Sequence, residues 1–418
     1  MTIGSKIRYH RVRKNLTQEE LAKGVLSVSY LSKIENNQIN ASQEILDLLC
    51  NRLGIENIEQ SNEIMKQALQ NWNKALLRSD IEESKRLRKI LQTTISDADE
   101  FSILTGYQIL LIRFHLLMNN LDEASRLITD IHHYYKDLSD QLKFYYRKFT
   151  GNYYYATKKY DNAIEHFKEA EHLFMIARIP QQEEKADLFY RISLALVQLR
   201  KHTTAIIYSE KSLDLYQSLY HNKRCAEVHL LLGVCYRRTH NIDEALFHYE
   251  WANEISKTNR YTLLRGNVEQ NLGYLKSTKG LTDEAIVHYL TSLGFKNEHN
   301  ESKLSTLVTL VKEYYKLNQF DEMNKWLKEG FLIATKTQYP AKYYQLKIYE
   351  YLANGFSEEF EQFMVQEALP YFEKHGNPHH IAQFSKFLGQ YYQEIRKYKY
   401  AAHYLTKANA AYENILGD

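Results

Sequence analysis

The chain opens with apolar residues at helical spacing. Ile3, Ile7 and Val12 recur at near-helical intervals, and five Lys or Arg but no Asp or Glu occur in the first 14 residues. An apolar stripe among basic residues predicts an amphipathic helix with a basic outer face.

Polar capping residues mark the next helices. Thr17 begins Thr-Gln-Glu-Glu, a capping box that predicts a short helix over about 17–24. Ser27 is placed to cap a third helix over 28–36, and Asn40 or Ser42 a fourth. The predicted buried face of the fourth helix holds Ile45, Leu48, Leu49 and Leu53. Together these segments predict a compact head of four or five short helices.

A repeat organises residues 56–418. Four glycines each precede an alanine by 12 residues, and a small residue follows each alanine seven positions later; the glycine–alanine pairs are Gly151 and Ala163, Gly233 and Ala245, Gly273 and Ala285, and Gly389 and Ala401. The same slot recurs at Ser84, Ala124, Ala205 and Met323, with successive gaps from 124 to 323 of 38 to 42 residues. This period predicts about nine stacked helix pairs.

The repeat chemistry suits closely packed antiparallel helices. Small residues let two helices approach, an aromatic four positions after the alanine is expected to fill the gap to the next pair, and acidic residues before the alanine suit the start of the second helix. The pattern resembles the tetratricopeptide repeat with a period near 40. That resemblance implies an α-solenoid whose concave face is lined by the first helix of each pair. The predicted fold is therefore all-α, with a head at 1–55, a linker at 56–62 and repeats at 63–418.

Composition supports a helical, DNA-binding protein. Only 4 Pro and 15 Gly interrupt 418 residues, and 34 Tyr suit helix seams with wet edges. Residues 1–55 hold eight basic and five acidic residues, which accounts for the whole net charge of +3. A basic head is expected to face phosphates. The three cysteines lack metal-site or disulfide spacing, and no signal peptide or membrane span is evident, so we expect a reduced, cytoplasmic location.

The head closely resembles the Cro/C1-type helix-turn-helix from Leu16 to Glu35. The resemblance implies that the third helix enters the major groove. It implies base-edge or phosphate contacts from Gln18, Ser27, Ser29, Tyr30, Lys33 and Asn36. The turn at Gly24 is one residue shorter than in the usual motif, so the angle of the third helix in the groove is expected to differ. The alternatives are a helix-turn-helix reused for protein contact and, for Tyr30, simple packing.

Polar residues at the inward positions of the repeats are candidates for binding a peptide. Asparagine can donate to and accept from one peptide group, and Arg or Lys can take a carboxylate. The candidates are Lys148, Asn152, Arg237, Arg238, Asn267, Gln270, Asn271, Tyr274, Lys312 and Tyr315. For each alone, a solvated polar position is an equally good interpretation.

No phosphate loop, metal motif or nucleophile with a matched base is apparent, so we expect neither catalysis nor a cofactor nor a metal site. A Cro-like head joined to tetratricopeptide-like repeats resembles the RRNPP family, the peptide-pheromone receptors of Gram-positive bacteria. The resemblance implies DNA binding at two half-sites, controlled by an imported signalling oligopeptide, and a homodimer or tetramer formed through the repeats. The alternative to a transcription regulator is a peptide-gated inhibitor that sequesters a sporulation phosphorelay response regulator. This activity is also compatible with a second role of the same protein.

Overall fold

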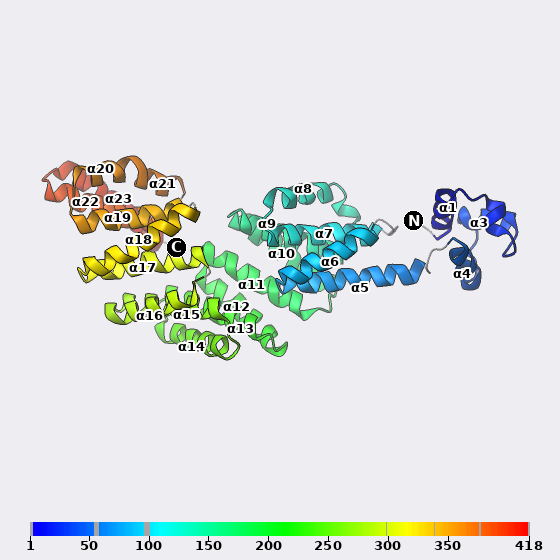
Figure 1. The fold of residues 1–418 in the computed structure, drawn as a ribbon, viewed down its shortest axis with the longest axis horizontal. Coiled ribbons are helices and arrows are strands. Elements are labelled where there is room, and N and C mark those ends of the chain that lie inside the picture. The colour runs from blue at the N-terminus through cyan, green and yellow to red at the C-terminus, as the bar shows by residue number, and fades with distance from the viewer. Residues whose placement is uncertain are drawn as a thin grey trace. The chain divides into compact units, whose positions relative to one another are not determined.

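The computed structural model describes residues 3–53, 58–95, 101–297, 299–337, 339–375 and 378–416. In these residues all regular structure is helical, which confirms the all-α prediction. Two compact units, Met1–Ala195 and Leu196–Asp418, divide the chain, and their boundary falls within helix α11 (Figure 1).

Four short helices form the head: α1 Ile3–Arg13, α2 Gln18–Ala22, α3 Val28–Glu35 and α4 Gln43–Arg52. Their shared core contains Ile7, Leu21, Leu31, Ile34 and Leu49, each at most 1% exposed. Helices α1 and α3 approach closely because residue 4 is glycine: a Cβ there would lie 1.7 Å from the carbonyl oxygen of Ile34.

Two sequence predictions for the head were wrong. Val12 is 56% exposed and Leu48 is 52% exposed. The buried stripe of α4 instead holds Leu46, Leu49 and Leu53, spaced by three and four residues. Leu48 lies two positions from Leu46, which turns it to the opposite side of the helix.

In the first unit, the repeats begin with α5. The helices are α5 Ile58–Leu77, α6 Ile81–Thr94, α7 Phe101–Leu117, α8 Leu121–His132, a 3₁₀ turn Tyr135–Asp137, α9 Asp140–Ala156, α10 Tyr160–Ile176 and α11 Gln182–Gln198. Helix α5 starts inside the segment predicted as a linker, so residues 58–62 are helical, while 56 and 57 lie outside the described residues.

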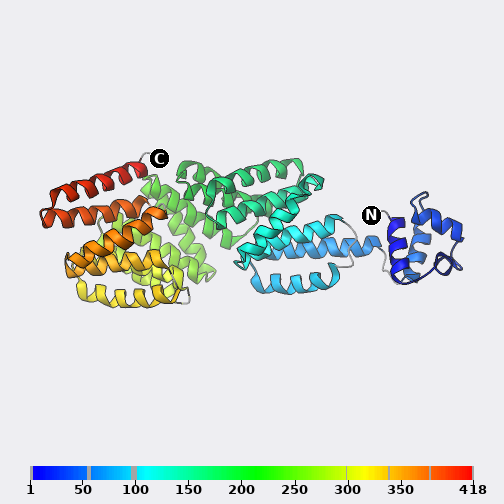
Figure 2. The same ribbon diagram turned by 90° about the horizontal axis from the view of Figure 1, so that it is seen from above.

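The second unit continues the same pairing. Its helices are α12 His202–Ser218, α13 Asn222–Arg238, α14 Ile242–Thr258, α15 Thr262–Thr278, α16 Thr282–Phe295, α17 Asn300–Lys316, α18 Phe320–Thr337, α19 Pro340–Asn354, α20 Glu358–Phe363, α21 Leu369–Lys374, α22 Pro378–Glu394 and α23 Tyr398–Leu416. Seen from above, the last pair, α22 and α23, lies side by side (Figure 2). Over the described residues, α5–α23 form nine helix pairs, as the repeat predicts.

The small-residue slots lie inside the helix seams. Ala163, Ala245 and Ala285 are fully buried. A Cβ on Gly233 would lie 2.4 Å from Cε1 of Tyr249, so the glycine makes room for that ring. The aromatic therefore packs over the glycine of its own pair, rather than only filling the gap to the next pair as the sequence suggested.

The second helix of the pair that begins with α19 is interrupted. Residues Met364–Ala368 form a π-helical segment between α20 and α21. Pro370, the second residue of α21, has no N–H to donate to the preceding turn, which is consistent with the local widening. This explains why the repeat signal degenerates around Phe360.

Candidate DNA-binding face and peptide-binding surface

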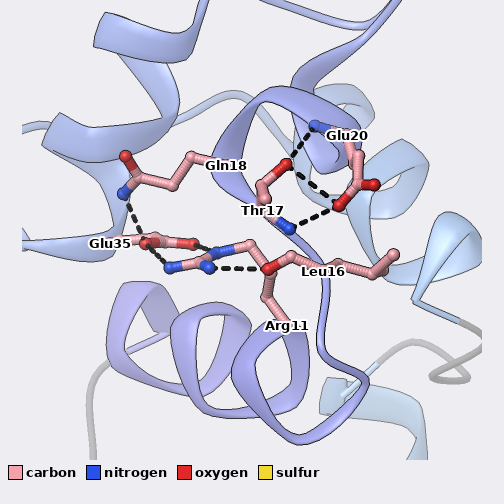
Figure 3. Close-up of polar contacts among 6 residues, drawn as sticks. All are labelled: Arg11, Leu16, Thr17, Gln18, Glu20 and Glu35. Carbon is pink, nitrogen blue, oxygen red and sulfur yellow. Dashed lines mark hydrogen bonds and ion pairs between the residues drawn. The ribbon is translucent and has the colours of Figure 1, made fainter.

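The start of α2 is fixed by the expected capping box (Figure 3). Thr17 Oγ1 accepts from the Glu20 N–H at 3.1 Å, and the Thr17 N–H donates to Glu20 Oε2 at 2.7 Å. The hydrogen bonds that the Glu20 carboxylate accepts, first from the Thr17 backbone N–H and then from the Thr17 hydroxyl, lower the pKa of that carboxyl. Helix α3 begins in the same way, because Ser27 Oγ accepts from the Tyr30 N–H at 3.2 Å.

A buried ion pair joins α1 to α3 (Figure 3). Arg11 donates from Nε and Nη2 to the two oxygens of Glu35 at 2.7 and 2.9 Å, and from Nη1 to the Leu16 carbonyl at 2.8 Å. Gln18 Nε2 donates to the same carboxylate at 2.8 Å. Arg11 therefore links α1 to α3, and the Gln18 amide is partly engaged because it donates to the same Glu35 carboxylate.

The outer side of α3 is polar and exposed. Ser29, Lys33 and Asn36 are exposed and spaced by four and three residues, so they share one side of the helix. Tyr30 is half-buried and packs against the head core, as its packing alternative expects. The head thus presents a polar, partly basic helix face of the size that suits a major groove.

In the first unit, Lys148 on α9 is fully buried. Its Nζ lies 2.6 Å from Glu184 Oε2 and 2.8 Å from Asp187 Oδ2, both on α11 and both buried. Asn73 of α5 donates to the other Glu184 oxygen at 2.6 Å. The Lys148 ammonium is therefore occupied by two carboxylates, which argues against its predicted contact with a peptide.

Asn152, one turn further along α9, differs from Lys148. Its side chain is 8% exposed, and neither Nδ2 nor Oδ1 has a hydrogen-bond partner among the described residues. A buried amide without partners costs about 1–3 kcal/mol.

In the second unit, the structure brings eight predicted residues to helices α13, α15 and α17, and we call them the α13–α17 surface: Arg237, Arg238, Asn267, Gln270, Asn271, Tyr274, Lys312 and Tyr315. All eight are half-buried or exposed. The Arg237 guanidinium lies over the Tyr274 ring at 5.6 Å, which links α13 to α15. Tyr315 packs against Tyr349 at 5.6 Å, so part of its ring belongs to the seam with α19.

The α13–α17 surface is cationic. The Arg238 side chain reaches solvent, yet burial by the surrounding protein, followed by the charge of Arg237, lowers its pKa. Burial and then the charge of Lys316 lower the pKa of Lys312. Closely placed cations favour an anionic group.

Residues that the sequence analysis missed join this surface. Burial, followed by the charges of Lys312, Arg238 and Arg200, lowers the pKa of His379 at the start of α22. Arg200 and His379 carry no local motif that could have identified them. Only the curvature of the second unit brings them toward α13 and α17.

Other chemistry is sparse in the described residues. Cys50, Cys225 and Cys235 are buried, and burial raises the pKa of the Cys225 thiol to about 11 and of Cys235 to about 12. Among the residues that the structure describes, no cluster of His, Cys, Asp or Glu could hold a metal ion. No described helix combines the length and apolarity needed to cross a membrane.

Comparison with known proteins agrees with this geometry. A helix-turn-helix family profile matches residues 7–56, and a tetratricopeptide-repeat profile matches residues 184–258. The transcriptional activator NprA of Geobacillus stearothermophilus is 36% identical over 95% of this chain and 100% of its own length. The chain belongs to the RRNPP family.

Within the RRNPP family, the chain is close to NprR. The apo form of the quorum sensor NprR from B. thuringiensis has a TM-score of 0.73 at 20% identity, covering 84% of this chain and 99% of that one. NprR in complex with its cognate peptide NprX has a TM-score of 0.65 at 20% identity, covering 85% and 98%. The regulatory protein RapD of Bacillus subtilis is 27% identical over 62% of this chain and 73% of its own length.

Proposed function

We propose that this chain is a quorum-sensing transcription regulator whose DNA binding is controlled by an imported oligopeptide held by its helical repeats. The full-length relationship to the activator NprA carries this proposal, because it covers the head and the repeats together. The location is the cytoplasm, where both DNA and an imported peptide are accessible.

The head is proposed to read DNA through α3. Ser29, Lys33 and Asn36 contact base edges. Ser27, which caps the start of α3, and Gln18, at the start of α2, lie near phosphates. One small head buries too little groove surface for tight binding, so two heads act on an operator with two half-sites. A homodimer or tetramer formed through the repeats supplies the second head.

The repeats are proposed to bind the peptide. The amides of α15 suit a peptide backbone, and NprR is solved with its cognate peptide. The cations of the α13–α17 surface suit a carboxylate of the ligand. We propose a regulatory rather than an enzymatic role for this arrangement.

Two selections with the full-length protein test the DNA and peptide parts separately. Genomic DNA fragments are selected with the wild type and with Lys33→Ala, and exposed Lys89→Ala on α6 is the matched control. We expect a two-half-site sequence for the wild type and Lys89→Ala, and a preference weakened by about 1–3 kcal/mol for Lys33→Ala. Selected affinity should also fall steeply with salt. An unchanged preference of Lys33→Ala would remove α3 from the DNA interface.

Peptides are selected from a pool of randomised heptapeptides and identified by mass spectrometry. The wild type and Asn324→Ala, an exposed amide on α18, should retain the same defined set. Asn271→Ala should lose affinity for that set by about 1–3 kcal/mol if it pairs with the peptide backbone. No retained set for the wild type would refute the peptide part of the proposal.

Removal of residues 1–60 tests the placement of the oligomer interface. Light scattering should give the same oligomer with and without the head. A monomeric truncated protein would place the interface in the head instead.

A second role rests on the likeness to the response regulator aspartate phosphatase H of Bacillus subtilis, which is 21% identical over 82% of this chain and 94% of its own length. In that role the repeats would bind a phosphorelay response regulator. A pull-down from cell extract with and without the selected peptide should then capture a response regulator in one condition only.

A further inference from the structure

A fully buried lysine lies beneath the α13–α17 surface. Lys296 directly follows α16 and is 0% exposed. Its stem packs against α15 where that helix has a glycine: a Cβ on Gly266 would lie 3.0 Å from Cγ of Lys296. The backbone of α15 thus leaves space for a cation at a place where most proteins put an apolar side chain.

The lysine has neutral partners. Its Nζ donates to Gln270 Oε1 on α15 and, at 3.0 Å, to Thr306 Oγ1 on α17. Burial alone accounts for the lowering of the Lys296 pKa to about 7, with no contribution from an acidic group of the described residues. Lys296 forms no ion pair with the residues that the structure describes, and its polar contact with α15 is the Gln270 side chain.

This contact decides which way the Gln270 amide points. In its protonated form Lys296 has three N–H donors and no lone pair, so the Gln270 atom that faces it is the oxygen. The Thr306 hydroxyl, 3.0 Å from the same oxygen, adds a second donor. The Gln270 NH₂ group consequently faces away from the core. Burial raises the pKa of Tyr274 and a hydrogen bond from Gln270 lowers it, as expected for an N–H that donates to the phenol oxygen.

The two neighbouring amides on α15 are fixed as well. Asn267 Oδ1 accepts from the Ser302 hydroxyl at 3.0 Å, which turns its NH₂ group outward. Asn271 Nδ2 donates to the backbone carbonyl of Asn267 at 2.9 Å, which leaves Oδ1 of Asn271 as an acceptor. Helix α15 therefore presents two donors and one acceptor in a defined order.

We propose that Lys296 is a positioning residue that fixes Gln270 as a hydrogen-bond donor toward the ligand. At this point of α15 the ligand must then supply an acceptor, a peptide carbonyl or a carboxylate oxygen. The inference rests on the proposed function, because it takes the α13–α17 surface to be where the peptide binds.

Two variants separate the alternatives. Gln270→Glu keeps an oxygen toward Lys296 and gains an ion pair with it, but it has no N–H for the ligand. Lys296→Met keeps most of the buried volume but no longer holds Gln270. Asn324→Asp, the same change of charge on exposed α18, is the control.

Both variants should bind the heptapeptides selected by the wild type about tenfold more weakly, the factor expected for one lost hydrogen bond. Gln270→Glu should melt at or above the wild-type temperature, and Asn324→Asp should bind normally. If Lys296→Met does not fold, Gln270→Glu still decides the outcome, because unchanged peptide affinity in that variant overturns the inference.

A measurement without ligand tests the positioning itself. With selective ¹⁵N-glutamine labelling, the Gln270 NH₂ signals are assigned by their loss in Gln270→Glu. They should show slow solvent exchange and restricted motion in the wild type, and both properties should be lost in Lys296→Met. Unchanged Gln270 signals in Lys296→Met overturn the inference. If the wild type retains no peptide, the proposed function itself fails, a result distinct from peptides that bind wild type and Gln270→Glu equally.

Discussion

Replacement of Lys148 by methionine should destabilise the first unit strongly. The change removes the cation that lies 2.6 Å from Glu184 and 2.8 Å from Asp187, while the side chains of all three residues are at most 2% exposed. Arg191, 3.3 Å from Asp187, and Asn73 remain as partners. Loss of one member of a buried ion cluster costs about 3–5 kcal/mol, because a carboxylate is left in a medium that solvates it poorly.

Hydrogen exchange measured by mass spectrometry is the suitable assay for Lys148→Met, since a chain with two compact units need not unfold in one step. Peptides from α9 and α11 should exchange much faster than in the wild type, and those from α17 should be unchanged. Lower pH should reduce the difference in stability between Lys148→Met and the wild type, because a carboxylate left without its cation can take up a proton. The triple variant with Glu184→Gln and Asp187→Asn should recover much of the loss. A deficit below about 1 kcal/mol, or one independent of pH, would refute the reasoning.

Three further predictions concern the second unit. Ala245→Leu should overpack the α13–α14 seam and lower stability by about 1–3 kcal/mol in urea melts, and normal melting would show that the seam has room. His240 has φ 62° in the turn between α13 and α14, and Gly280 has φ 76° at the same position of the turn between α15 and α16. His240→Gly should therefore raise the free energy of unfolding, and Gly280→Ala should lower it, each by roughly 0.5–1 kcal/mol. Changes of the opposite sign would contradict this turn geometry. The folded-state pKa of Lys296, about 7, lies below its ordinary value of 10.5. The folded protein then binds fewer protons than the unfolded chain between these values, and its unfolding free energy should rise with pH, by up to about 1.4 kcal/mol per unit, relative to Lys296→Met. Parallel pH dependence in the two proteins would contradict the buried position.

Local patterns determined most of the fold. The capping box at Thr17 and the cap at Ser27 act within four residues, so the sequence alone predicts where α2 and α3 begin. The alanine slots recur because each must fit the same narrow seam, and their period predicts nine helix pairs without any long-range information. The wrong predictions, Val12 and Leu48, fall at helix positions where hydrophobicity alone does not decide which side faces the core.

Long-range contacts decided the roles of the polar residues. The sequence does not show that Lys148 would meet Glu184, 36 positions away, or that Arg11 would meet Glu35 instead of DNA. Lys296 looks like an ordinary surface lysine until α15 and α17 enclose it, and the influence of Arg238 on His379 depends on the curvature of the second unit. The physical reason is that a helix repeat is specified by spacing along the chain. The charge, burial and hydrogen-bond polarity of a side chain are instead set by whichever distant helix packs against it.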